Sequence, residues 1–142
     1  MTRRLALVAC VALAACSLPP VQVAHVTAMS LAEANHVAAL VCAEVAVTQA
    51  STDPAKGEAT LGKCKAAHAK AHSALLVAGA AIDAWRAGAA GAPGCVVLDA
   101  QVAVLELASL VRSGGGKLSE AVDSAIAFAG NAVTAQLGGC KR

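Results

Sequence analysis

A chain of 142 residues has the length of a single domain. Its 11 lysines and arginines and 9 acidic residues give a formal net charge of +2, and it has no Tyr, one Trp and one Phe. Nucleic-acid interfaces combine basic patches with aromatic side chains, so this composition excludes nucleic acid as a partner. It also excludes a protein that is held on a membrane by charge alone.

The first fifteen residues have the layout of a secretory signal peptide. Arg3 and Arg4 form a basic start, Leu5 to Leu13 form an apolar run, and Ala14-Ala15 supplies small residues before a cleavage point. The run is too short to cross a bilayer, which takes about 20 apolar residues in a helix. The alternative is a buried first helix of the domain, but that helix would have no polar residue to mark its solvent face.

The four residues from Leu13 to Cys16 (LAAC) resemble the lipobox of bacterial lipoproteins. The resemblance implies that residues 1–15 are removed, that Cys16 carries diacylglycerol on its sulfur, and that the new amine is acylated. Leu7 to Cys10 (LVAC) fits the same pattern, but its apolar run is too short for a signal core. Ser17 follows the lipidated cysteine, where an aspartate retains enteric lipoproteins at the inner membrane, so the outer membrane is favoured. Stable anchoring takes two membrane signals, and a cysteine with two or three acyl chains meets that need.

The mature chain is expected to begin with a tether. Residues 16–29 contain Pro19 and Pro20 and show little periodicity. Ser30 to Glu33 (SLAE) has the capping-box form, which predicts a helix from 30 to 50. Asp53 and Pro54 suit the N-cap and the first position of a second helix, which is expected to end at Arg86.

Two more helices are expected after a loop of Ala, Gly and Pro at residues 87–94. The third is nearly all apolar from Cys95 to Arg112, and the fourth extends from Lys117 to Leu137 after a glycine-rich turn. Gly138-Gly139 follows as a C-terminal stop. The sequence therefore predicts an all-α fold, an up-down bundle of about four helices built as two helical hairpins over residues 30–142.

Four more cysteines follow the lipobox: Cys42, Cys64, Cys95 and Cys140. An even number in an exported protein predicts two disulfides, for which three pairings exist. Cys42 and Cys64 lie about equally far from the turn at 52–53, so they should face each other across an antiparallel hairpin. Cys95 and Cys140 are then left to pair at the far ends of the third and fourth helices.

Two histidines suggest a metal-binding alternative. His68 and His72 follow Cys64 at intervals of four, so the three share one helix face, and His at i and i+4 can bind one metal ion. With His36 on the neighbouring helix, they would form a zinc or copper site. The competing interpretation places Cys64 in a disulfide and both histidines at the edge of the hairpin. No other cofactor is expected apart from the covalent lipid.

Trp85 and Arg86, at the end of the second helix, are the candidate residues for binding a partner. Trp and Arg are enriched at binding hot spots, although the competing interpretation, in which Trp85 caps the core, is favoured. The chain has neither the G-x-S-x-G motif nor a phosphate-binding P-loop. We therefore expect a protein that is not an enzyme.

Together these features predict a lipid-anchored protein of the cell envelope. It would face the periplasm, at the outer membrane rather than the inner one, and would bind or shield an envelope partner or act structurally. The chain also resembles the alanine-rich small lipoproteins of phage and prophage genomes, through the lipobox, the capped helix and the hairpin that ends at Asp83 to Gly88 (DAWRAG). That resemblance implies a lysis accessory or a block of the receptor against a second phage.

Two alternatives stay open. One is a periplasmic bundle that binds metal through His68 and His72. The other is a membrane-permeabilising lysis accessory that uses residues 96–111, although Asp99 and Glu106 would each cost roughly 2.5–3.5 kcal/mol in a bilayer.

Overall fold

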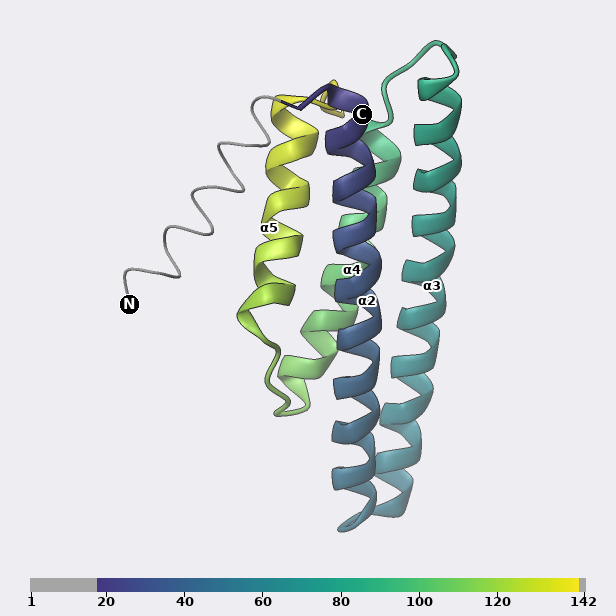
Figure 1. Ribbon diagram of the computed structural model, residues 1–142. Helices are drawn as coiled ribbons and strands as arrows, with labels where there is room; N and C mark the ends of the chain where they lie inside the picture. The colour runs from purple at the N-terminus through teal and green to yellow at the C-terminus, as the bar shows by residue number, and fades with distance from the viewer. Residues whose placement is uncertain (1–17, 141–142) are drawn as a thin grey trace, which may run out of the picture.

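The computed structural model describes residues 18–140, and all of the regular structure in that range is helical. The helices are α2 (Pro20–Ala50), α3 (Pro54–Arg86), α4 (Gly94–Ser113) and α5 (Glu120–Ala135). Consecutive helices run in opposite directions and are joined by short connections (Figure 1). The predicted all-α bundle of about four helices is confirmed.

The two hairpins of the bundle differ in length. α2 and α3 have 31 and 33 residues, whereas α4 and α5 have 20 and 16. α2 and α4 each contact all three other helices, and α3 and α5 flank this pair. In Figure 1 the lower part of the α2–α3 hairpin extends well beyond the connection between α4 and α5.

The expected tether at residues 16–29 is wrong for its described part, because α2 begins at Pro20. Pro19 occupies the N-cap and Pro20 the first helical position, where the missing N–H of proline costs no hydrogen bond. The predicted helix start at Ser30 is therefore also wrong. Ser30 to Glu33 lies inside α2, where the backbone N–H groups are already paired along the helix.

The first turns of α2 have a buried face whose apolar pattern is interrupted in the sequence by a threonine. Val23, Thr27 and Leu31 are fully buried and share one face of the helix. Thr27 looks polar in the sequence, but its hydroxyl donates a hydrogen bond to the carbonyl oxygen of Val23 at 2.7 Å. With its donor satisfied inside the helix, Thr27 packs as an apolar residue.

α3 has the bounds that the sequence predicts. The carboxylate of Asp53 accepts a hydrogen bond from the backbone N–H of Lys56 at 3.0 Å, and Pro54 is the first helical residue. Gly57 packs against the end of α2, where a Cβ atom would lie 2.6 Å from the backbone N and Cα of Ala50. Only glycine allows the two helices to approach so closely at this turn.

α5 is shorter at both ends than the expected span of 117–137. A Cβ atom on Gly116 would lie 2.6 Å from a methyl group of Val45, so the connection is pressed against α2 before α5 begins. Ser119 has the extended backbone of an N-cap, with φ −70° and ψ 153°. Gly138 and Gly139 follow α5 with positive φ angles of 79° and 62°, which confirms the expected glycine stop.

The core is built from small and medium-sized side chains. Its largest fully buried side chains are Leu31, Ile82, Leu107 and Leu137, and most of the others are Ala and Val. Exposed ion pairs join Lys70 of α3 to Glu106 of α4 and Arg112 of α4 to Asp123 of α5. Exposed pairs of this kind contribute about 0–1 kcal/mol each, so apolar packing and the disulfides hold the bundle together.

Candidate functional site

Both disulfides form with the expected pairing. Cys42 of α2 and Cys64 of α3 are bonded with Cα atoms 5.9 Å apart, and Cys95 and Cys140 with Cα atoms 4.7 Å apart. Cys42 and Cys64 are buried between the long helices. The bond from Cys95 to Cys140 joins the start of α4 to the segment after α5. Cys64 is therefore not available as a metal ligand.

The lipobox lies outside the described residues. Leu13 to Cys16 precedes residue 18, so the predicted modification of Cys16 has no structural test. Cys16 is nevertheless four residues before Pro20, the first residue of α2. A fully extended chain of four residues spans about 14 Å, so whatever is attached to Cys16 stays close to this end of the bundle.

His68 and His72 lie next to each other on α3. Their ring centroids are 6.3 Å apart, and Nδ1 of His68 lies 3.3 Å from Oδ1 of the buried Asn35 on α2. This polar contact ties His68 to the α2–α3 interface. Among the described residues, no cluster of three or more His, Cys, Asp or Glu side chains is arranged to bind a metal ion. Within that range, a metal at His68 and His72 would have two histidine ligands and no third from these residue types.

Trp85 and Arg86 differ in burial. Trp85 is partly buried and packs against the main hydrophobic core, which is the capping role weighed against partner binding. Arg86 is exposed and is the last residue of α3. Both lie at the end of the bundle where α2 begins and α5 ends (Figure 1).

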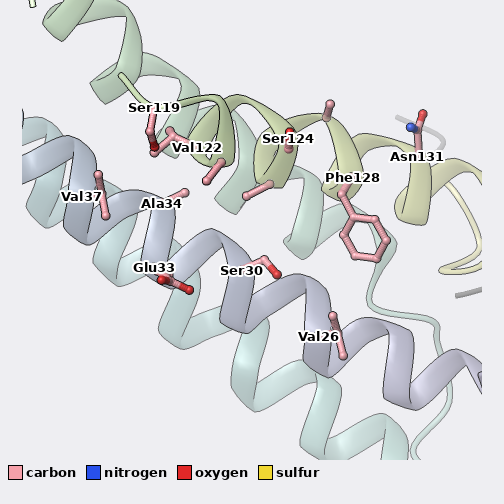
Figure 2. Close-up of a pocket in the computed structure, with 13 residues that line it drawn as sticks. Val26, Ser30, Glu33, Ala34, Val37, Ser119, Val122, Ser124, Phe128 and Asn131 are labelled. Carbon is pink, nitrogen blue, oxygen red and sulfur yellow. The ribbon is translucent and has the colours of Figure 1, made fainter. Parts of the chain in front are cut away.

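A groove lies between α2 and α5, with a volume of about 570 Å³. Figure 2 shows Val26, Ser30, Glu33 and Val37 along the α2 wall, and the ring of Phe128 extending from α5 between the two helices. The full lining is Val26, Ser30, Glu33, Ala34, Val37, Ser119, Ala121, Val122, Ser124, Ala125, Ala127, Phe128 and Asn131.

The walls of the groove are mostly apolar. The polar lining residues are three serines, one glutamate and one asparagine, and no lysine or arginine takes part. The groove stays open because α5 presents small side chains to it, including Ala121 and Ala125. Sequence reasoning missed this site. Val26 is 41% exposed at the groove, but in the sequence it looks like any other apolar helix residue, so no local signal marks the site.

The chain matches no protein-family model, no curated protein and no solved structure at a significant level.

Two described helices, α2 and α4, are long and apolar enough to cross a membrane by length and composition alone. This is weak evidence, because the core helices of soluble bundles have the same properties. In the bundle, Glu106 of α4 accepts hydrogen bonds from Nζ of Lys70 on α3 at 2.6 and 2.9 Å. In a bilayer, α4 would lose this ion pair and expose Glu106 to hydrocarbon.

Proposed function

We propose that this protein is a bacterial lipoprotein anchored in the cell envelope through Cys16, facing the periplasm and favouring the outer membrane. Its disulfide-stapled bundle would bind or shield an envelope partner, or act structurally, without catalysing a reaction. A phage or prophage origin fits the resemblance of the sequence to alanine-rich phage lipoproteins. The basic start, apolar run and LAAC box occur in the order that such signals require.

The observation that carries the proposal is the pairing of all four cysteines downstream of the box. Cys42 bonds to Cys64 and Cys95 to Cys140, so residues 18–140 contain no free thiol. Disulfides persist in oxidising compartments such as the periplasm and are rare in the cytosol. The disulfides thus support the same compartment as the signal, through independent residues.

The position of Cys16 also sets an orientation for the anchored bundle. The start of α2, the α3–α4 connection and the end of α5 lie together at one end (Figure 1). An anchor at most about 14 Å from Pro20 would hold this end, with Trp85 and Arg86, nearest the membrane. The turn after Ala50 would then point away, because the 31 residues of α2 extend for about 46 Å.

A binding role is supported by large apolar side chains that the bundle leaves exposed. Met29 and Val47 on α2 are 72% and 70% exposed, and Leu76 on α3 is 62% exposed. These side chains are spread along the two long helices, so a partner that binds along the length of the bundle would cover several of them.

The test is the mass of the protein extracted in detergent from bacterial membranes without reductant. We expect a chain that begins at Cys16, carries acyl chains and lacks four thiol hydrogens. Cys16→Ser should abolish acylation and cleavage, whereas the matched variant Cys10→Ser should be processed like the wild type. An unprocessed and unlipidated wild-type chain, or a lipid on Cys10, would contradict the proposal.

Metal binding stays a second candidate because the structure brings the rings of His68 and His72 together on one helix face. If it is correct, the His68→Ala/His72→Ala variant loses stoichiometric zinc or copper binding that the wild type shows in a calorimetric titration. Equal binding by the two proteins would exclude these histidines as the ligands.

Membrane permeabilisation is the third candidate, favoured by the length and apolar composition of α4. It requires that the wild-type protein release dye from liposomes, and that a proline introduced at Val104 reduce that release. Equal leakage with the proline variant would exclude a role for α4 as a spanning helix.

A further inference from the structure

We propose that the groove between α2 and α5 holds one acyl chain of the lipid on Cys16 of the same molecule. This inference rests on the proposed lipidation of Cys16. It adds an intramolecular lipid site, in which the bundle covers part of its own anchor.

The chemistry of the walls suits a hydrocarbon chain. The lining is dominated by Ala, Val and Phe side chains, and its one ionisable group, Glu33, is exposed. An alkyl chain has no hydrogen-bonding groups and loses none on entering such a groove. A polypeptide backbone would have to leave N–H and C=O groups unpaired against these walls, and an anionic ligand would find no lysine or arginine.

The length of the groove matches one acyl chain. Its α2 wall extends from Val26 to Val37, and eleven residues of helix rise about 16 Å. The hydrocarbon core of a bilayer is about 30 Å thick, so the chains of one leaflet reach about 15 Å. The groove has a volume of about 570 Å³ and is lined by residues of both α2 and α5.

The attachment point lies within reach of the groove. Val26 is six residues after Pro20, so the groove begins about 9 Å along α2. Cys16 lies four residues before Pro20, and the intervening segment contains Pro19. For a chain of about 15 Å to extend from Val26 to Val37, Cys16 must lie beside Val26. The segment of four residues before Pro20 spans at most about 14 Å, which is enough for it to fold back over the 9 Å to Val26.

Stable anchoring does not need every acyl chain of the lipid on Cys16 to lie in the bilayer. A mature lipoprotein of this kind carries acyl chains on both the sulfur and the amine of its cysteine, whereas two chains are enough for stable anchoring. One chain can therefore occupy the groove while the others remain in the bilayer. The exposed side chain of Val26 and the partly buried ring of Phe128 would then be covered.

The test uses the lipidated protein in living bacteria. Cells are fed a palmitate that carries a diazirine group, so that the acyl chains on the protein become photoreactive. After irradiation the protein is purified, and crosslinked peptides are identified by mass spectrometry. We expect crosslinks from the Cys16 lipid to residues 26–37 of α2 and to residues 119–131 of α5.

Two groove-filling variants and one control test the assignment. Ser30→Trp and Ala121→Trp place a large ring in the groove and should cause loss of these crosslinks. Ser73→Trp places the same ring on an exposed position of α3 and should leave them unchanged. The two groove-filling variants change different helices, so a folding defect in one of them does not remove the test. Circular dichroism of each variant shows whether its helical content is intact.

Three results would overturn the inference. Crosslinks from the Cys16 lipid to membrane lipids alone would place every chain in the bilayer and leave the lipoprotein proposal intact. Groove crosslinks that persist in Cys16→Ser would show that the groove takes free lipid instead. The absence of photoreactive lipid from wild-type Cys16 would refute the proposed function and this inference with it.

Discussion

Removing the disulfide between Cys95 and Cys140 should strongly destabilise the bundle. The bond closes a loop over a sequence separation of 45 residues, for which the chain-entropy relation gives about 4.0 kcal/mol at 25 °C. Both cysteines are only partly buried, so replacing them with alanine leaves no closed cavity and the loop effect dominates. Domains of this size are stable by about 5–15 kcal/mol, so the loss is a large fraction of the total.

The assay is urea unfolding of the oxidised Cys95→Ala/Cys140→Ala variant, followed by far-UV circular dichroism. With a urea dependence of about 1–3 kcal/mol per molar, the midpoint should fall by roughly 1–4 M. Adding reductant to the variant should lower its stability by about a further 3.4 kcal/mol, because the bond between Cys42 and Cys64 spans 22 residues. A loss below about 1 kcal/mol for the first bond would refute the loop argument.

Three further predictions concern packing, each measured by urea or thermal unfolding. Gly62→Ala should stabilise the protein by up to about 1 kcal/mol, because the glycine lies in α3 with open space around the added methyl group; destabilisation would contradict this. Gly94→Ala should destabilise the protein by about 1–3 kcal/mol, because the new Cβ would overlap the carbonyl oxygens of Leu137 and Gly139. An unchanged unfolding midpoint would show that the C-terminal segment moves aside at no cost in stability. Leu107→Ala should cost about 2–5 kcal/mol because Leu107 is fully buried, while Leu105→Ala, at a position 44% exposed, should cost much less; equal costs would contradict the assigned core.

The parts of the fold that local chemistry determines could be predicted from the sequence. The start of α3 followed from Asp53, whose carboxylate accepts a hydrogen bond from the backbone N–H of Lys56, and from Pro54, which has no N–H to pair. The bond between Cys42 and Cys64 followed from their equal distances to the turn in an antiparallel hairpin. Both inferences needed only neighbouring residues and standard helix geometry.

The missed features depend on contacts between distant segments. The first turns of α2 were missed because Thr27 is buried, an environment that its side chain alone does not reveal. α5 begins late because Gly116 is pressed against Val45, some seventy residues away in the chain. The groove likewise depends on the distance between α5 and α2 as well as on the small side chains of α5, and no local pattern encodes that distance.

The extension of the α2–α3 hairpin beyond α4 and α5 has a consequence for amide exchange. Residues 46–60 form a two-helix tip, and Gln49 makes one of its few links to the other hairpin, a side-chain bond of 3.4 Å to the carbonyl of Gly114. With little core to hold it, the tip should open locally and exchange its amide hydrogens well before the bundle unfolds. The covalent bond between Cys42 and Cys64 lies at the base of the tip, so opening that begins at the turn should stop there. Reduction of that bond would let the fraying continue into the body of the hairpin.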